Sequence, residues 1–238
     1  MKKLMKLQLR NLFYSKVFYI CTILTIVLSV GLTYITSLFS TKIMAPKVLP
    51  QIVGIFTGGV DIIGMIFITV YCVLDFNEGT TKNIIARGYS KTKLLISKYI
   101  SAFIGMILLD LIVSLVIFIL YIKNGFGYEN TLLLQLLYGI CCTLTYTIFY
   151  VTISFILEKT SSSIIANLFI LKIINLILVF TGKYLKIDIS KFWLENVGAT
   201  FMDKPTLSHL AFPLLMYAAY IAVFSFIGIY IAKNKEIK

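Results

Sequence analysis

The sequence predicts an all-α integral membrane protein with six transmembrane helices. Of its 238 residues, 59% are hydrophobic and only 13% are charged, about half the charged share of an average soluble domain. Six apolar stretches are each long enough to cross about 30 Å of hydrocarbon as a helix, which takes about 20 residues. The alternation typical of barrel strands is absent from the sequence. These observations exclude a soluble enzyme, a disordered chain and a disulfide-stapled secreted module.

The six predicted spans are Val17–Phe39, Ile52–Leu74, Ile96–Ile122, Leu132–Leu157, Ser161–Thr181 and His209–Ala232. The first of them is too long for the hydrophobic part of a cleavable signal peptide, and most later spans are equally apolar. The sequence has no internal repeat and no linker long enough to divide it. We therefore expect residues 1–238 to form a single transmembrane domain.

Basic residues are distributed unequally between the two predicted sides of the membrane. The side that holds both ends of the chain and the loop after the second span carries 13 Lys and Arg, against 7 on the other side. Because positive loops stay on the cytoplasmic face, we expect both termini to be cytoplasmic. The net charge of +12 fits loops that face an anionic leaflet, and its scattered distribution excludes nucleic acid as a partner.

The segment 1–16, before the first span, is predicted to form an interfacial amphipathic helix. Its apolar residues group on one side, and its basic residues lie largely on the other; the two sets are Leu4, Met5, Leu9, Leu12 and Phe13, and Lys2, Lys3, Lys6 and Arg10. Such a helix lies in the headgroup plane and leads into the first span. A basic anchor that only sets the topology is compatible with the same pattern.

The loop 75–95, between the second and third spans, is predicted to hold two short helical pieces. Thr80 is placed to cap the first piece at its start, and Gly88 is placed to end it. Ile84 and Ile85 give this piece an apolar edge, and Ser90 is placed to cap the helix that runs into the third span. This capped helix is either a docking point for a soluble partner or simply a well-capped turn between two spans.

The segment 182–208, before the last span, has aromatic and aliphatic residues at three- and four-residue spacing. They are Ile189, Phe192, Trp193, Val197 and Phe201. The spacing predicts short outer interfacial helices that dip into or lie on the membrane surface, with Trp193 at headgroup depth. An ordinary aromatic anchor and a gating role both stay open for this segment.

The loop 75–95 also carries a resemblance to a known family. An acidic residue followed by Gly-Thr, an aliphatic residue, Gly-x-Ser-basic and a new span resembles the membrane subunits of ABC-2 type ABC transporters. Within that family it is most similar to the small bacterial permeases for bacitracin or lantibiotic immunity and for export of peptides like phenol-soluble modulins. The matching residues are Asp75 or Glu78, Gly79, Thr80, Ile85, Gly88, Ser90 and Lys91. Lys91 stands where many members have Arg.

The resemblance implies a permease subunit of an ATP-driven exporter in a bacterial plasma membrane, with an amphipathic peptide or drug as cargo. The loop would be its cytoplasmic coupling helix, which contacts a separate ATP-binding subunit; the assembly would contain two copies of that subunit, which hold ATP and Mg. A second permease chain, identical or different, would complete the membrane pathway. The sequence lacks a phosphate-binding G-x-x-x-x-G-K-[ST] loop, so the chain is not expected to be an enzyme by itself. The predicted coupling residues are Asp75, Glu78, Gly79, Thr80, Ile84, Ile85, Gly88, Ser90 and Lys91.

Asp61, Asp110 and Lys172 lie near the middle of their predicted spans, about 14–18 Å from the span ends. A charge at that depth costs at least about 2.5–3.5 kcal/mol, so we expect pairing or water. One hypothesis is that Asp61 or Asp110 pairs with Lys172 and holds helices together. The same residues could instead form a polar wall of a substrate cavity. A third hypothesis is a proton- or ion-coupled secondary transporter that uses Asp61 and Asp110.

The four cysteines, Cys21, Cys72, Cys141 and Cys142, all fall inside predicted spans. Their spacing lacks the C-x-x-C pattern of zinc sites, and His209 is the single histidine. We therefore expect reduced cysteines that fill space, and neither a metal nor a cofactor in this chain. The motifs of intramembrane serine and metalloproteases are also absent from the sequence.

Overall fold

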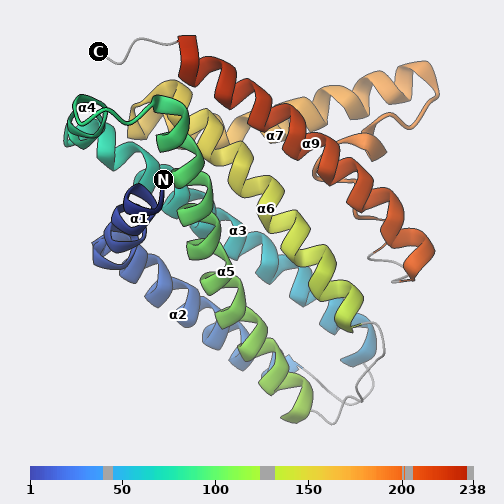
Figure 1. Cartoon of the computed structure of the whole chain (residues 1–238). Helices are drawn as coiled ribbons and strands as arrows, with labels where there is room; N and C mark the ends of the chain where they lie inside the picture. Colours follow the sequence, from blue (N-terminus) through green and yellow to red (C-terminus); the bar gives the residue numbers. More distant parts are fainter. Residues whose placement is uncertain (40–44, 124–131, 200, 202–205, 235–238) are drawn as a thin grey trace.

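The computed structural model describes residues 1–39, 45–123, 132–199, 201 and 206–234. Their side chains are described except at 32–60, 117–118, 120–123, 132–133 and 135–136. Within these residues the regular structure is entirely helical (Figure 1). The elements are α1 (Lys2–Tyr14), α2 (Lys16–Phe39), α3 (Ala45–Asn77), α4 (Thr80–Ala86), α5 (Lys91–Lys123), α6 (Leu132–Leu157), α7 (Thr160–Leu185), the 3₁₀ turn η1 (Ser190–Phe192) and α9 (Leu207–Asn234).

The long helices follow the predicted spans closely. In the described part of the chain, α5, α6, α7 and α9 are each long and apolar enough to cross a membrane. Two further candidates are bent pairs, with α1 at 54° to α2 and the end of α3 at 62° to α4. The chain is therefore an all-helical, multi-pass membrane protein with four to six candidate spans, which confirms the predicted fold class.

The core lies where α3, α5 and α6 meet, and it is closed by large apolar side chains. Phe67 and Ile68 of α3, Leu95 of α5 and Val151 of α6 are all fully buried. Small residues allow the helices to approach one another closely. A Cβ at Gly105 of α5, for example, would lie 2.6 Å from the Phe67 ring. The packing of α3 against α5 therefore leaves no room for a side chain at position 105.

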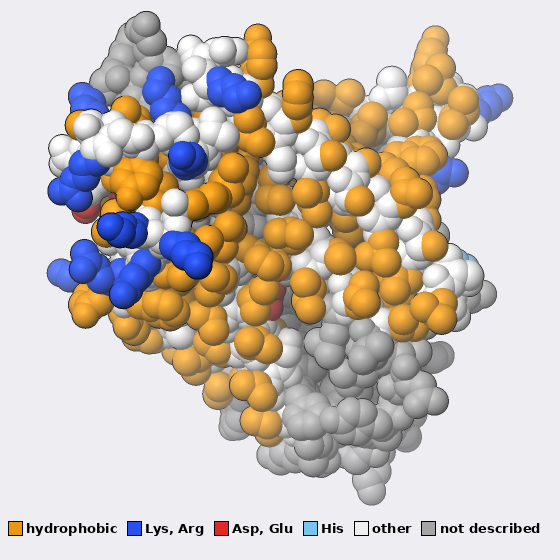
Figure 2. Space-filling model, in the orientation of Figure 1, with side chains coloured by type: hydrophobic (Ala, Val, Ile, Leu, Met, Phe, Trp, Pro, Cys, Tyr) orange, Lys and Arg blue, Asp and Glu red, His pale blue; other side chains and the backbone are white. Residues whose placement is uncertain are grey.

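Apolar side chains also cover much of the outer surface, where a soluble protein would be polar (Figure 2). The exposed apolar residues of α2, α7 and α9 include Ile23, Val27, Phe169, Leu176, Leu215 and Phe226. Such a surface is suited to lipid. Lys and Arg gather instead around α1 and α4, at one end of the molecule (Figure 2).

The N-terminus, α4 and the last turn of α9 all lie at this same end of the bundle (Figure 1). This arrangement is what an even number of spans requires, and it agrees with the common side predicted for both termini. That this side is the cytoplasm stays a prediction. Residues 235–238, which include two of the basic residues counted for this side, lie outside the described residues.

Candidate functional site

The start of the short helix α4 depends on a glycine. Gly79 immediately precedes the helix and has φ = 68°, a left-handed conformation that lets the chain turn sharply out of α3. Thr80 is therefore the first helical residue, and the prediction that it caps the helix was wrong. Its hydroxyl turns back instead and donates to the carbonyl of Asp75 at 3.1 Å.

The end of α4 has the hydrogen bonds of a Schellman motif. Gly88, with φ = 85°, donates its amide to Ile85 at 2.9 Å, and the amide of Tyr89 donates to Ile84 at 3.4 Å. The prediction that Gly88 ends this helix is confirmed. Ser90 then caps α5 as predicted, because its hydroxyl accepts a hydrogen bond from the amide of Lys93 at 3.3 Å.

A small apolar cluster fixes α4 to the rest of the molecule. Ile84 packs with Leu4 of α1 and Leu94 of α5, and Leu7 and Tyr89 lie against them. Ile84 is buried and Ile85 is half-buried, so the apolar edge predicted for this helix faces the protein. The opposite face is exposed and consists of Lys82, Asn83, Ala86 and Arg87, with Glu78 exposed just before the helix.

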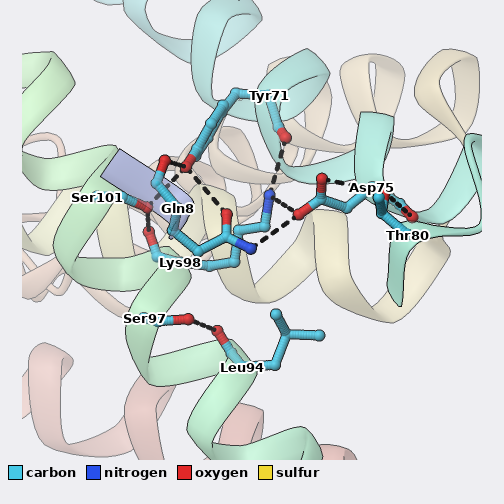
Figure 3. A network of polar contacts seen from close by, with 8 residues as sticks. All are labelled: Gln8, Tyr71, Asp75, Thr80, Leu94, Ser97, Lys98 and Ser101. Carbon is cyan, nitrogen blue, oxygen red and sulfur yellow. Dashed lines mark hydrogen bonds and ion pairs between the residues drawn. The ribbon is translucent and has the colours of Figure 1, made fainter. Parts of the chain in front are cut away.

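Beneath α4 lies a buried ion pair (Figure 3). The Nζ of Lys98 on α5 is 2.6 Å from Oδ2 of Asp75, near the C-terminal end of α3. The same carboxylate accepts a hydrogen bond from Nε2 of Gln8 on α1 at 3.1 Å. Lys98 also donates to the Tyr71 carbonyl at 3.2 Å, and it lies 4.2 Å from the centre of the Tyr71 ring.

Tyr71 extends this network to α1 and α5. Its hydroxyl donates to the Gln8 carbonyl at 2.9 Å and lies 2.9 Å from the hydroxyl of Ser101. All of these side chains are buried, and both charges are compensated by close partners, as buried ions require. The network therefore ties α1, α3 and α5 together, and Asp75 also contacts Thr80 at the start of α4 (Figure 3).

Two sequence predictions are corrected here. Asp75 was placed among the residues of the coupling surface, but it is 6% exposed and supports that surface from within. The helix predicted within segment 1–16 forms as α1, but its apolar residues do not share one environment: Leu4 and Leu12 are buried against the protein with Gln8 between them, whereas Phe13, predicted on the same side, is exposed. Sequence reasoning missed Lys98 and Gln8. The available signal was an acidic residue at the end of one apolar span and a lysine at the start of the next.

The remaining predicted coupling residues fall on both sides of α4. Glu78 and Ser90 are exposed, whereas Thr80 and Lys91 are half-buried. The predicted coupling residues therefore lie together around α4, a helix with one face packed against the protein and one face exposed.

The three charges predicted to meet at mid-depth do not form an ion pair with one another. Lys172 on α7 pairs instead with Glu195, with a 2.7 Å separation between Nζ and Oε1. Asp110 accepts a 2.6 Å hydrogen bond from Thr143. Asp61 is exposed and lies within electrostatic range of both Asp110 and Lys172. The predicted pairing of either aspartate with Lys172 is therefore wrong, because Glu195 comes back along the chain to take that place.

Glu195 reaches Lys172 because the segment after α7 folds back into the bundle. Trp193 donates from Nε1 to the carbonyl of Leu171 at 3.2 Å, and Leu171 lies about 21 Å from the C-terminal end of α7 at 1.5 Å per residue. Leu194, Val197 and Phe201 are buried as well. Trp193 therefore lies beside the middle of α7 rather than beside its end. Residues 200 and 202–205 of the predicted outer segment lie outside the described residues.

The side chains that could bind a metal or form disulfides are the metal-ligating groups and the four cysteines. Among the described residues, no group of three or more His, Cys, Asp or Glu is placed to hold a metal ion. All four cysteines are free thiols; Cys21 and Cys72 are buried, and Cys141 and Cys142 are half-buried.

The chain matches one described family and no protein with a curated description. The match covers residues 60–238, which include the end of α3, the whole of α4 and every later helix. The chain therefore belongs to the DUF2705 family, a family of proteins of unknown function.

Proposed function

We propose that this protein is the permease subunit of an ATP-driven exporter of amphipathic peptides or similar hydrophobic molecules. In this proposal, a separate ATP-binding subunit docks on α4 and supplies the ATPase activity. The observation that carries the proposal is the geometry of α4. It is a short helix, with left-handed glycines before and after it, whose polar face is exposed beyond the ends of α3 and α5.

The contacts between α4 and the rest of the protein would transmit a movement of α4 to other helices. Ile84 is held between α1 and α5, and Thr80 is hydrogen-bonded to Asp75. A displacement of α4 alone would break the apolar cluster and disturb a buried ion pair, and each of these costs free energy. A partner that moves α4 would therefore move α1 and the inner ends of α3 and α5 with it.

The surface around Lys172 supports a polar route through the membrane. The side chain of Lys172 is 73% exposed, and its neighbours on the same face, Phe169, Ile173 and Leu176, are also exposed. A lysine that meets hydrocarbon at mid-depth costs at least about 2.5–3.5 kcal/mol. Water or a second polypeptide against this face would avoid that cost. A transport pathway between two permease chains would supply both.

Co-purification tests the docking of an ATPase on α4. The tagged chain is co-expressed with the ATP-binding subunit that the proposal expects to be encoded beside it, and the stoichiometry of the purified complex is measured. We expect one ATPase per permease chain, and its loss in the variant K82E/R87E. The matched control K183E/K191E changes two exposed lysines near the outer segment and should keep the ATPase.

Two results would count against the proposal. Retention of the ATPase by K82E/R87E at full stoichiometry would exclude α4 as its docking site. A chain that purifies with no nucleotide-binding partner from its own membranes would exclude the ATP-driven mechanism as a whole.

A proton- or ion-coupled carrier is the second candidate function. The observation that favours it is that Asp61 lies within electrostatic range of both Asp110 and Lys172. Transport by vesicles that contain the chain alone, driven by a pH gradient without ATP and abolished by Asp61→Asn, would support this function over the first.

A further inference from the structure

The exposed side of α1 carries a stripe of basic and aromatic side chains. Its members are Lys2, Lys3, Lys6, Arg10, Phe13 and Tyr14, all exposed, with Phe13 at 45% and Tyr14 at 82%. At 3.6 residues per turn they fall within an arc of about 120°. Leu4, Gln8 and Leu12 lie on the opposite side of the helix and are buried against the protein. The face that α1 turns outward is therefore its basic face.

No carboxylate of α1 balances this charge, because the helix contains no acidic residue. Lys2, Lys6 and Arg10 follow each other at four-residue spacing, and like charges at that spacing destabilise a helix. Asp75, which approaches α1 through Gln8, is already paired with Lys98. Within the part of the chain that the structure describes, no carboxylate therefore forms an ion pair with the basic residues of the stripe.

The position of α1 indicates where a balancing negative charge comes from. Only Ser15 separates α1 from α2, so Tyr14 lies within two residues of a candidate span. With α2 along the membrane normal, the 54° bend and the 13 residues of α1 give the helix a rise of roughly 11 Å across the interface. Exposed aromatic residues at the end nearest the span and basic residues farther out match the order of acyl boundary and phosphate in a leaflet.

We propose that this stripe is a binding site for the phosphate groups of anionic phospholipids. The basic residues contact the phosphates, while Phe13 and Tyr14 insert at the boundary with the acyl chains. This inference is independent of any ATPase on α4. An acidic surface of a partner protein is the competing occupant, but it would leave the two exposed aromatic residues beside the span without a role.

Lipid titration of the full chain in neutral detergent, followed by native mass spectrometry, tests the site. The probes are phosphatidylglycerol and phosphatidylcholine, and the dissociation constant of the first bound lipid is measured for each. Three basic residues near an anionic headgroup are expected to favour phosphatidylglycerol by about a hundredfold. The variant K2Q/K6Q/R10Q should reduce this preference to a few-fold, and added salt should reduce it in the unmodified chain.

The control variant K183Q/K186Q/K191Q removes three exposed lysines from the other end of the molecule and should keep the full preference. The three substituted residues of α1 are all exposed, so the stripe variant should keep the melting temperature of the lipid-free chain. An unchanged preference for phosphatidylglycerol in the stripe variant would overturn the inference. So would a stripe variant that loses a protein partner while its lipid preference stays intact.

Discussion

Lys98→Met should destabilise the end of the bundle next to α4 far more than the loss of one surface charge would. Lys98 is 2% exposed and Asp75 is 6% exposed, and their charged atoms lie 2.6 Å apart. Removal of one partner from such a pair leaves a buried charge uncompensated, which costs about 3–5 kcal/mol. Asp75→Asn should cost a similar amount, because the buried ammonium of Lys98 would lose its counter-charge and keep only neutral partners such as the Tyr71 carbonyl and ring.

The double variant D75N/K98M tests whether the pairing itself causes these losses. With both charges removed, the amide that replaces the Asp75 carboxylate can still accept a hydrogen bond from Gln8, and a methionine of similar length fills the space of Lys98. We expect the double variant to be only about 1–2 kcal/mol less stable than the unmodified chain, so that the two changes are strongly non-additive. The free energy of unfolding is measured in mixed detergent micelles by titration with a denaturing detergent.

The ion pair between Lys172 and Glu195 is the control for this cycle. The Lys172 side chain is 73% exposed, so its pair is expected to contribute less than about 1 kcal/mol in a hydrated environment. Losses from D75N and K98M that simply add in the double variant would refute the claim that the two charges compensate each other.

Three further predictions concern single positions. Gly88→Ala should cost about 1–2 kcal/mol, because its φ of 85° is strained for any side chain while nothing lies within 4 Å of the new Cβ; unchanged thermal stability would contradict this. Gly105→Ala should lower the free energy of unfolding by about 1–3 kcal/mol, because its new Cβ would clash with the Phe67 ring. Gly31→Ala is the control: nothing lies within 4 Å of its new Cβ, so it should leave the melting temperature unchanged. Lys172→Cys and Phe226→Cys are compared in a chain whose native cysteines have been replaced, because Phe226 on α9 is as exposed as Lys172. The cysteine at 172 should react at least tenfold faster with a water-soluble thiol reagent. Equal reaction rates would exclude water at Lys172.

Much of this fold could be predicted from the sequence because hydrocarbon leaves the backbone few choices. The predicted span Leu132–Leu157 is α6 without any change, and the other spans differ from their helices mainly by a few residues at the ends. Gly88 and Ser90 were also predictable, because a left-handed helix end and a hydroxyl cap are local features. Thr80 was misplaced as a cap because Gly79, one residue earlier, can adopt the conformation that starts the turn.

The polar residues inside the bundle could not be predicted in the same way, because their partners come from distant parts of the chain. Gln8 and Asp75 are 67 positions apart, and no local pattern connects them. Glu195 lies in the segment 182–208, which was predicted to form short helices at the membrane surface, yet a reversal of the chain after α7 brings it to Lys172. Only the fold of that segment decides that Lys172 meets Glu195 rather than Asp61 or Asp110.

The buried network also explains why the end of the bundle next to α4 needs polar residues at all. An apolar contact such as that of Ile84 with Leu4 and Leu94 fixes the distance between helices but tolerates sliding, since apolar attraction has little directional preference. Hydrogen bonds and a close ion pair add direction: Gln8, Lys98 and Tyr71 satisfy one another in only one register of α1, α3 and α5. An apolar replacement of the whole network should therefore preserve stability more readily than it preserves the position of α4. The measurement that separates the two is the distribution of distances between spin labels on α4 and α6, which should broaden in D75N/K98M although that variant loses only about 1–2 kcal/mol of stability.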